Sequence, residues 1–439
     1  MSAPAANEKC STLERSLISE LNRFGLLEAI FGRRARRFAV GMSVPDGPLK
    51  FESKHPPQPL SAAERTILVL CGAGISGWNF GLPHTTTSPA GTGCNYPVRL
   101  VGRTYPSAAG IHASELLFTD DSGAYITQFR DLAPERLQEL QSAADFDTLV
   151  ERTARHIVKI GDARVTLPKQ FPHIESHNFW TANQPGTTLF VPVVDLAQQT
   201  LDGLAILLGE QAVPYDAVHD RYCGNLEPFI RSGLLDDTRR VPLADFEQYL
   251  LATAVGEITA ANYNIVLVLQ AMGLGGWLYS GINPLSLLGA AAADGIPGFG
   301  FRCTTRADWS TPNPVGLDGL FEGFCPPYVA DMRAAAAKLI ERKFGAGGTY
   351  DPTTAGPYRD NARVKQAVAR YQPQFVECLG EVADYIHATF GKFPATAPSM
   401  YARLYAQAQH IDTEFYDEHF GPGAYLATHA EHERKWHAH

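Results

Sequence analysis

The chain has 439 residues and a formal net charge of -9, with 45% hydrophobic and 19% charged residues. This is the composition of a folded globular protein, and it excludes an intrinsically disordered chain. The acidic balance also argues against nucleic acid or an anionic membrane as the main partner, because both require a broad basic surface.

The N-terminal part of the chain predicts two helices separated by an extended segment. Apolar residues recur at intervals of three and four from Thr12 to Ile30, as on one face of an amphipathic helix. A second helix begins after Ser61, which is a good N-cap, and ends at Gly72 or Gly74. The stretch 81–105 is rich in glycine and proline, so we expect a long loop insertion there.

Strands and one long helix make up the middle of the chain. The apolar runs Glu115–Phe118 and Thr188–Val194 favour strands, and Gly298–Cys303 favours a third. Residues 132–160 have a helical, exposed pattern, and Phe246–Leu274 is the longest helical pattern, ending in several glycines. Helices and strands are mixed without a repeating βαβ unit, so we predict an α+β fold.

The chain beyond about residue 308 has a different pattern. Residues 308–328 are rich in proline and predict a loop, and helical patterns follow at 329–344, 361–390 and 399–419. We therefore predict a mostly helical C-terminal extension over residues 306–439. It would pack on a core that is already complete by residue 305, or on a partner subunit.

Four arginines, Arg33, Arg34, Arg36 and Arg37, follow the first predicted helix within a single turn of chain. The planar guanidinium group matches phosphate oxygens bidentately, so the cluster favours a cofactor phosphate as its ligand. The alternative is a solvated basic face, or a cluster that caps the end of the helix.

Several motif classes are absent from the sequence. The seven cysteines form no CxxC pair, which argues against a zinc ribbon and a disulfide framework. No GxGxxG follows a predicted strand, and neither a serine-nucleophile elbow nor a Walker lysine loop occurs. The start of the chain has no signal-peptide pattern, and no uninterrupted apolar run of about 18 residues occurs, so we expect a cytoplasmic protein.

Four elements, taken in order, resemble the FMN-dependent nitroreductase family. They are the apolar helix followed by RRARRF, the helix begun by PLS, the segment GRTYPSAAGIHASELLFTDDSGAY, and the helix that ends in NYNIVLVLQAMGLGGW. The resemblance covers roughly residues 12–305, and its layout is similar to the branch with the thiazole- and oxazole-forming dehydrogenases. It implies a mixed sheet flanked by helices, an FMN-binding domain over residues 1–305, and a site at a homodimer interface.

The resemblance implies where the flavin phosphate would bind. Arg33 and Arg36 correspond to the phosphate-binding arginines of the family. Arg34 stands where the family usually has serine, and this departure changes the geometry of the contact. Arg302 or Arg306 would complete the phosphate site.

The resemblance also assigns residues to the flavin ring. Pro106, Ser107 and Gly110 correspond to the loop that hydrogen-bonds the edge of the isoalloxazine, although Pro106 and Ser107 alone also fit an ordinary turn before a strand. Asn264 stands at the asparagine of the family's long helix, where packing is the alternative role. Gly275 belongs to the glycine-rich helix end, which permits a close approach of the backbone.

Ser280 and Gly281 are the implied catalytic positions. They correspond to the dipeptide whose backbone amide points at flavin N5 in the family. Such a preformed donor stabilises charge that develops on the ring.

Two further features limit the functional prediction. The azole-forming relatives carry a Lys-Tyr pair before the long helix, and this chain does not, which puts azoline oxidation in doubt. Tyr222 or Tyr249 could act as an acid, although packing is the more common role of such a tyrosine.

The C-terminal segment is rich in histidine and aromatic residues. His429 and His432 could share a metal with Glu414 or His419, but the spacing matches no metal-binding motif, and we expect no metal. We expect the aromatic residues to dock the segment onto the body of the protein or onto the partner subunit.

The predicted function is FMN-dependent transfer of hydride from NADH or NADPH to a flat electrophile, such as a nitroaromatic compound or a quinone. A dehydrogenase that desaturates a peptide or a small metabolite is the alternative, as is a flavin-binding protein without turnover. We expect a homodimer that acts on small molecules and contacts neither nucleic acid nor membrane.

Overall fold

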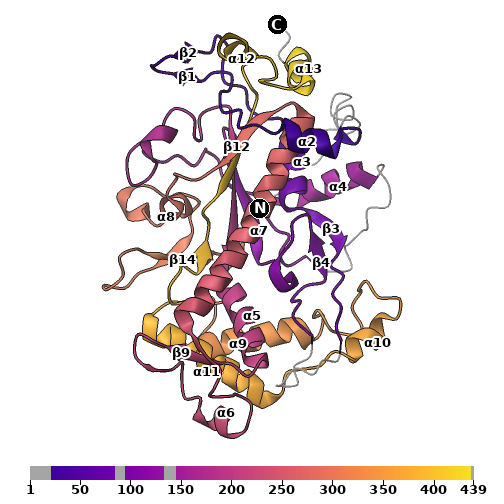
Figure 1. Ribbon diagram of the computed structural model, residues 1–439, viewed down its shortest axis with the longest axis vertical. Helices are drawn as coiled ribbons and strands as arrows, with labels where there is room; N and C mark the ends of the chain where they lie inside the picture. The colour runs from indigo at the N-terminus through magenta and orange to yellow at the C-terminus, as the bar shows by residue number, and fades with distance from the viewer. Residues whose placement is uncertain (1–20, 85–93, 133–144, 437–439) are drawn as a thin grey trace.

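The computed structural model describes residues 21–84, 94–132 and 145–436. Its centre is an antiparallel seven-stranded sheet with the strand order β12-β17-β8-β5-β6-β7, in which the short strand β16 also pairs with β8 (Figure 1). The strands are β5 (Ser114–Asp120), β6 (Gly123–Thr127), β7 (Ile157–Gly161), β8 (Thr188–Asp195), β12 (Gly275–Tyr279), β16 (Met400–Tyr401) and β17 (Tyr405–Gln409).

The two faces of this sheet belong to two different hydrophobic clusters, because successive side chains of a strand point to opposite faces. Leu116 and Phe118 of β5 pack against helices α3 (Ala62–Ala73) and α7 (Leu243–Met272), whereas Leu117 faces the other cluster. The second cluster contains Trp277 and Tyr279 of β12 and the residues around α8 (Pro284–Leu288). The sheet is therefore buried on both faces.

A third cluster lies at one end of the sheet, where four helices pack together. These are the C-terminal helices α9 (Met332–Phe344) and α11 (Pro373–Phe390), together with α5 (Leu196–Gly209) and the first half of α7. The remaining helices are α2 (Leu26–Gly32), α4 (Asp145–Arg155), α6 (Glu227–Arg231), α10 (Asn361–Gln366), α12 (Thr413–His419) and α13 (Ala427–Trp436), with 3-10 turns η1 (Ala108–Gly110), η3 (Ser176–Asn178) and η4 (Ala292–Asp294).

Four small sheets surround the centre. They are β1 (Ser43–Val44) with β2 (Phe51–Glu52), β3 (Ile75–Trp78) with β4 (Val101–Arg103), β9 (Val213–Asp216) with β10 (Arg221–Tyr222) and β11 (Arg240–Pro242), and β13 (Arg302–Thr304) with β14 (Asn313–Leu317) and β15 (Phe321–Glu322). The structure therefore confirms the α+β fold class.

Elements with strong local signals form where the sequence predicts them. Helix α3 begins with a capping box: Ser61 Oγ accepts from the amide of Glu64 at 3.2 Å, and the Glu64 carboxylate accepts from the amide of Ser61 at 2.7 Å. Helix α7 ends at Gly273, which has a φ of 70° and so provides the left-handed cap that terminates a helix. Strand β8 and strand β5 also match their predicted positions.

Other predicted boundaries are wrong. The first helix is interrupted after residue 21 and resumes as α2, and residues 1–20 lie outside the described part of the chain. Residues 157–160 form strand β7 rather than the end of a helix, because they pair with β6. The predicted strand 298–303 is reduced to β13, and the predicted helix 361–390 is divided into α10 and α11 before Pro373, a residue that cannot continue a helix from its N-terminal side.

The prediction of a C-terminal extension is also wrong in one important respect. The sequence predicts a helix over residues 399–419, but they contain β16 and β17, and β17 lies inside the central sheet between the edge strand β12 and β8. The core is therefore not complete by residue 305. After α11 the chain returns to the core and adds β16 and β17 to the central sheet. A domain boundary between residues 305 and 306 would therefore separate strands of one sheet.

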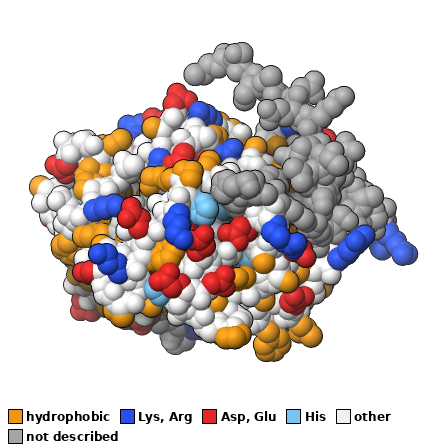
Figure 2. Space-filling view, turned by 90° about the horizontal axis from the view of Figure 1, so that it is seen from above, with side chains coloured by type: hydrophobic (Ala, Val, Ile, Leu, Met, Phe, Trp, Pro, Cys, Tyr) orange, Lys and Arg blue, Asp and Glu red, His pale blue; other side chains and the backbone are white. Residues whose placement is uncertain are grey.

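Helix α7 is long and apolar enough to cross a membrane, judged by length and composition within the described residues. In the structure it packs against α3, α5, β8 and β17. Figure 2 views the molecule from the end that carries α12 and α13. Among the described residues that are visible on this face, basic and acidic side chains are mixed with hydrophobic ones.

Candidate functional site

Arg36 is the most buried of the four clustered arginines, with 2% of its surface exposed. Its Nη1 donates to Gln270 Oε1 of α7 at 2.7 Å, and its Nε donates to the carbonyl of Ala424 at 2.9 Å. The guanidinium also contacts the carbonyl of Gly32 at the end of α2. Burial lowers its pKa to about 10, so it stays charged at neutral pH. These contacts give Arg36 a structural role, which differs from the phosphate role implied by the resemblance.

The other arginines of the cluster lie at the surface. Arg33 is exposed, and its side chain makes no hydrogen bond or ion pair within the described chain. Arg34 donates to the carbonyls of Phe31 and Arg33, so it caps the C-terminal end of α2. The guanidinium of Arg37 lies 5.3 Å from the ring centre of Trp277. The guanidinium of Arg33 is therefore available for an anion, and that of Arg37 is exposed beside the rings of Trp180 and Trp277.

Ser280 and Gly281 form a turn directly after β12. Ser280 is exposed and Gly281 is half-buried, with a φ of 90°. The carbonyl of Ser280 accepts from Asn178 Nδ2 at 3.0 Å, and the carbonyl of Gly281 accepts from the amide of Glu175 at 2.9 Å. The amide of Gly281 has no acceptor among the described residues, nor has Asn178 Oδ1 a donor. The turn thus has an unpaired donor at Gly281, and beside it lies a buried acceptor, Asn178 Oδ1, that also lacks a hydrogen-bond partner among the described residues.

One segment, residues 174–181, connects this turn to the arginine cluster. At its first end Ile174 pairs with Ile282, next to the turn. At its other end Thr181 Oγ1 donates to the carbonyl of Arg37 at 3.1 Å, and the ring of Trp180 lies 5.9 Å from the Arg37 guanidinium. The structure therefore assembles the arginine cluster and the Ser280–Gly281 turn around a common element.

Sequence reasoning missed the polar residues of this segment. Glu175 and His177 are exposed beside the turn, and Glu175 Oε2 lies 3.6 Å from His177 Nδ1. Asn178 fixes the turn through its side chain, as described above. The signal in the sequence is a short polar run, IESHN, between the aromatic residues Phe171 and Phe179, and without a fold it cannot be distinguished from a surface loop.

The predicted ring-edge loop belongs to a second group of residues around Glu257 in the middle of α7. Ser107 Oγ donates to Glu257 Oε2 at 2.6 Å, and Ser114 Oγ donates to the other carboxylate oxygen. Burial raises the pKa of Glu257, and the two serine hydroxyls partly offset this effect. Pro106 at the start of the loop is exposed. Gly110 has a φ of 64°, in the left-handed region that glycine tolerates.

The remaining predicted residues have structural contacts of their own. Asn264 Nδ2 donates to the carbonyl of Thr104 at 2.9 Å and so holds the start of the ring-edge loop against α7. At Gly275, a Cβ atom would lie 2.2 Å from Ile411 and 3.0 Å from the carbonyl of Arg36, so only glycine fits there. Arg302 is exposed on β13 and makes no hydrogen bond with the arginine cluster within the described chain.

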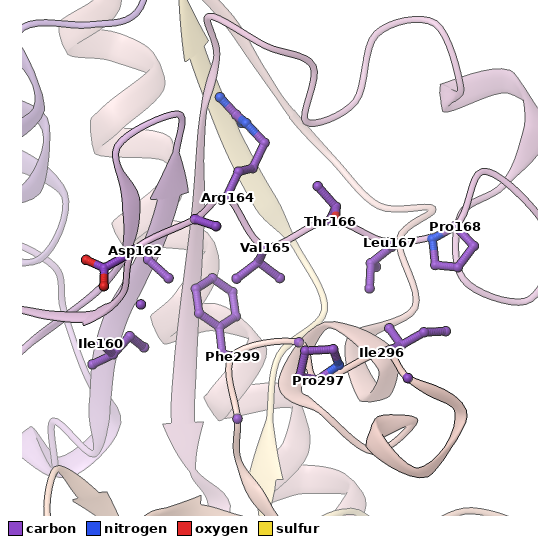
Figure 3. A pocket seen from close by; sticks show the side chains of 16 residues that line it. Ile160, Asp162, Arg164, Val165, Thr166, Leu167, Pro168, Ile296, Pro297 and Phe299 are labelled. Carbon is purple, nitrogen blue, oxygen red and sulfur yellow. The ribbon is translucent and has the colours of Figure 1, made fainter.

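A pocket of about 640 Å³ lies beside β7, the edge strand of the central sheet (Figure 3). It is lined by residues 160–168 and 295–300, and none of the predicted site residues lines it. Arg164 points away from Phe299 and Pro297, and its guanidinium is bound to Asp121, Asn183 and the carbonyl of Thr187. The walls are therefore mostly apolar side chains and backbone, without a reactive group aimed into the space.

No protein-family model matches the chain, and no curated protein matches it significantly. Among solved structures, the chain is similar to a provisionally assigned nitroreductase from Ralstonia eutropha, with 12% identity over 59% of this chain and 71% of that chain. The TM-score of that match is 0.26, which is too low to support an argument about fold or function.

Proposed function

We propose that this protein is an FMN-dependent oxidoreductase that transfers hydride between NADH or NADPH and a flat electrophilic acceptor, such as a nitroaromatic compound or a quinone. The observation that supports this function is the assembly of the arginine cluster and the Ser280–Gly281 turn around residues 174–181. The resemblance in sequence assigns the two ends of FMN to these two places, although they are far apart along the chain.

The residues at both ends suit the cofactor. Arg33 carries an exposed guanidinium without an internal partner, and it would bind the phosphate. The unpaired amide of Gly281 offers a donor to the edge of a planar heterocycle, and the buried Asn178 holds the turn through its bond to the carbonyl of Ser280. Bound FMN would supply the hydride chemistry, and these groups would orient it. No strong acid is required of the protein, which agrees with the absence of a catalytic dyad in the turn.

The ring-edge loop, residues 106–110, enters this proposal through a homodimer. Its serine contacts Glu257 of α7, and within one chain no hydrogen bond of the described residues joins it to the Ser280–Gly281 turn. A site shared between two subunits is expected to be divided in this way in each chain. We propose that the corresponding loop of the partner subunit completes the site.

The surface of the protein supports a dimer. Helix α2 exposes Leu26, Leu27 and Phe31 to 68%, 68% and 75%, which is unusual for three large apolar side chains on one short helix. Helix α2 packs on α7, whose outer face carries Gly256, Tyr263 and Leu267. A second copy of the chain that covered α2 would remove these apolar side chains from water.

The visible spectrum of the purified protein, followed by anaerobic addition of candidate electron donors, tests the function. The proposal predicts a flavin band that is bleached rapidly by NADH or NADPH and restored by a quinone. Bleaching by an organic substrate alone would indicate a dehydrogenase instead. A bound flavin that no donor reduces would indicate a binding protein without turnover.

A further inference from the structure

Three buried side chains from distant parts of the sequence meet at one point next to the end of the central sheet. Glu64 lies in the first turn of α3, His410 directly follows β17, and His432 lies on α13. Their exposed fractions are 0%, 2% and 5%. One donor atom of each residue lies within 4.8 Å of the others.

The distances between these atoms fit a single ion. His432 Nε2 lies 3.0 Å from His410 Nδ1 and 3.5 Å from Glu64 Oε1. The second nitrogen of His410, Nε2, lies 3.9 Å from Glu64 Oε2. A tetrahedral zinc ion with bonds of about 2.0–2.1 Å keeps its nitrogen and oxygen ligands about 3.3 Å apart. An ion would use one ring nitrogen of His410, and binding would replace the hydrogen bond between the two histidines and draw the donor atoms, which lie within 4.8 Å of one another, closer together.

Each of the three residues is held in place by contacts outside the cluster. The capping box with Ser61 fixes the carboxylate of Glu64. The carbonyl of His410 accepts from the amide of Val40 at 3.2 Å, which ties this strand end to the N-terminal segment. Helix α13 is anchored on α7, because Thr428 Oγ1 donates to the carbonyl of Gln270 at 2.7 Å. The absence of a side chain at Gly273 allows α13 to pack against it, since a Cβ there would lie 2.7 Å from His432 Cβ.

We propose that Glu64, His410 and His432 bind a divalent transition-metal ion, and that this ion is zinc. Two imidazoles and one carboxylate are borderline ligands that suit zinc and iron better than the hard cations calcium and magnesium. We name zinc because imidazole nitrogens and a carboxylate oxygen are ligands that it binds in tetrahedral sites, and because the three side chains supply three of the four positions that it needs. A water molecule or another nearby group would complete the tetrahedron.

The proposed site differs from the histidine pairing that the sequence suggested. His429 Nδ1 accepts from the amide of Leu426, and burial lowers the pKa of its ring to about 3, so it is a neutral packed residue. His419 packs between aromatic rings and lies beside Glu418. His432 instead finds its partners on α3 and at the end of β17, and this choice of partners cannot be read from spacing along the chain.

Zinc in this position would lock the N-terminal helix α3, the central strand β17 and the last described helix α13 to one another. This role is independent of the proposed flavin chemistry, since none of the three residues belongs to the proposed FMN site. The metal would act on stability, because binding to the folded state alone shifts the folding equilibrium.

The metal content of the purified full-length protein tests the proposal. After the metal is stripped with a chelator and zinc is added back, we expect about one tightly bound zinc ion per chain and a higher melting temperature. Glu64→Gln and His432→Gln should lose most of the bound zinc. His432→Cys should retain it, because a thiolate is a zinc ligand. His429→Gln is the matched control: it removes a buried histidine from the same helix and should leave the zinc content unchanged.

Cobalt provides a second measurement if a variant fails to fold. Cobalt added to the stripped wild-type protein should give the visible bands of a tetrahedral nitrogen- and oxygen-ligated ion, and one equivalent of zinc should remove them. The proposal is overturned if the stripped wild-type protein takes up no zinc. It is also overturned if the folded Glu64→Gln and His432→Gln variants keep the zinc of the wild type, because the metal then lies elsewhere.

Discussion

Replacing Arg36 with alanine separates the structural role of this residue from a role in cofactor binding. The substitution removes the donors of the buried Gln270 Oε1 and of the half-buried carbonyls of Ala424 and Gly32, of which the first two accept at 2.7 and 2.9 Å. A hydrogen bond to a charged group contributes about 1.5–3 kcal/mol. Because the guanidinium of Arg36 donates to three acceptors and is almost fully buried, we expect Arg36→Ala to lower the free energy of unfolding by about 3–5 kcal/mol.

Arg33→Ala is the matched control, since Arg33 is exposed and its side chain has no partner within the described chain. It should change the free energy of unfolding by less than about 0.5 kcal/mol, as surface substitutions usually do. Urea unfolding of the flavin-free proteins, followed by tryptophan fluorescence, measures both effects. If Arg36→Ala were as stable as the wild type while losing affinity for flavin, the interior role of Arg36 would be refuted and a phosphate contact favoured.

Three further predictions concern the dimer, the pH dependence and the flavin contact. Phe31→Glu places a charge on the apolar face of α2 and should convert the protein to monomers in light scattering, whereas an unchanged dimer mass would exclude α2 from the interface. Burial lowers the pKa of His429 from 6.5 to about 3, so between these two pH values the unfolded chain binds a proton that the folded chain does not. The free energy of unfolding should therefore fall as the pH decreases from about 6.5 toward 3. His429→Gln should make this fall smaller. A deaza-FMN, which has carbon in place of N5, cannot accept a hydrogen bond from the amide of Gly281. It should bind about 2- to 12-fold more weakly than FMN, because one hydrogen bond contributes about 0.5–1.5 kcal/mol. Equal affinities of the two cofactors would argue against this contact.

The last of these tests uses an altered cofactor because the backbone at Gly281 excludes the simplest substitution. Proline would remove the amide hydrogen, but its ring fixes φ near -65°, whereas Gly281 has a φ of 90°. Alanine would place its Cβ 2.5 Å from Asn178 Nδ2. Either variant would disturb the turn for reasons unrelated to flavin.

Elements with local signals could be predicted from the sequence, and those that depend on distant partners could not. The capping residues of α3 and the left-handed glycine after α7 fix their helix ends locally. Strand β17 has the sequence YAQAQ, which is neither β-branched nor strongly apolar. It is buried because Gln407 and Gln409 hydrogen-bond one another, and Gln407 also reaches the carbonyl of Thr181. These interactions exist only once the sheet has assembled.

The candidate site shows the same division. The sequence identified the arginine cluster and the Ser280–Gly281 turn, but it could not indicate which arginine faces inward. In an extended segment, neighbouring side chains point in different directions, so Arg36 faces Gln270 while Arg37 lies over Trp277. Residues 174–181 could not be predicted as part of the site, because they belong to it only through their contacts in the folded chain with Ser280, Ile282 and Arg37.

Titration of the flavin-free protein with FMN, for the wild type and for Arg33→Ala, tests the central claim most directly. The account predicts saturable binding to the wild type, with a flavin band that NADH or NADPH bleaches under anaerobic conditions. It also predicts that Arg33→Ala, although fully folded, binds FMN more weakly by about 1.5–3 kcal/mol, the contribution of a charge-assisted hydrogen bond. A wild-type protein that binds no FMN, or an Arg33→Ala variant with unchanged affinity, would contradict the proposed site.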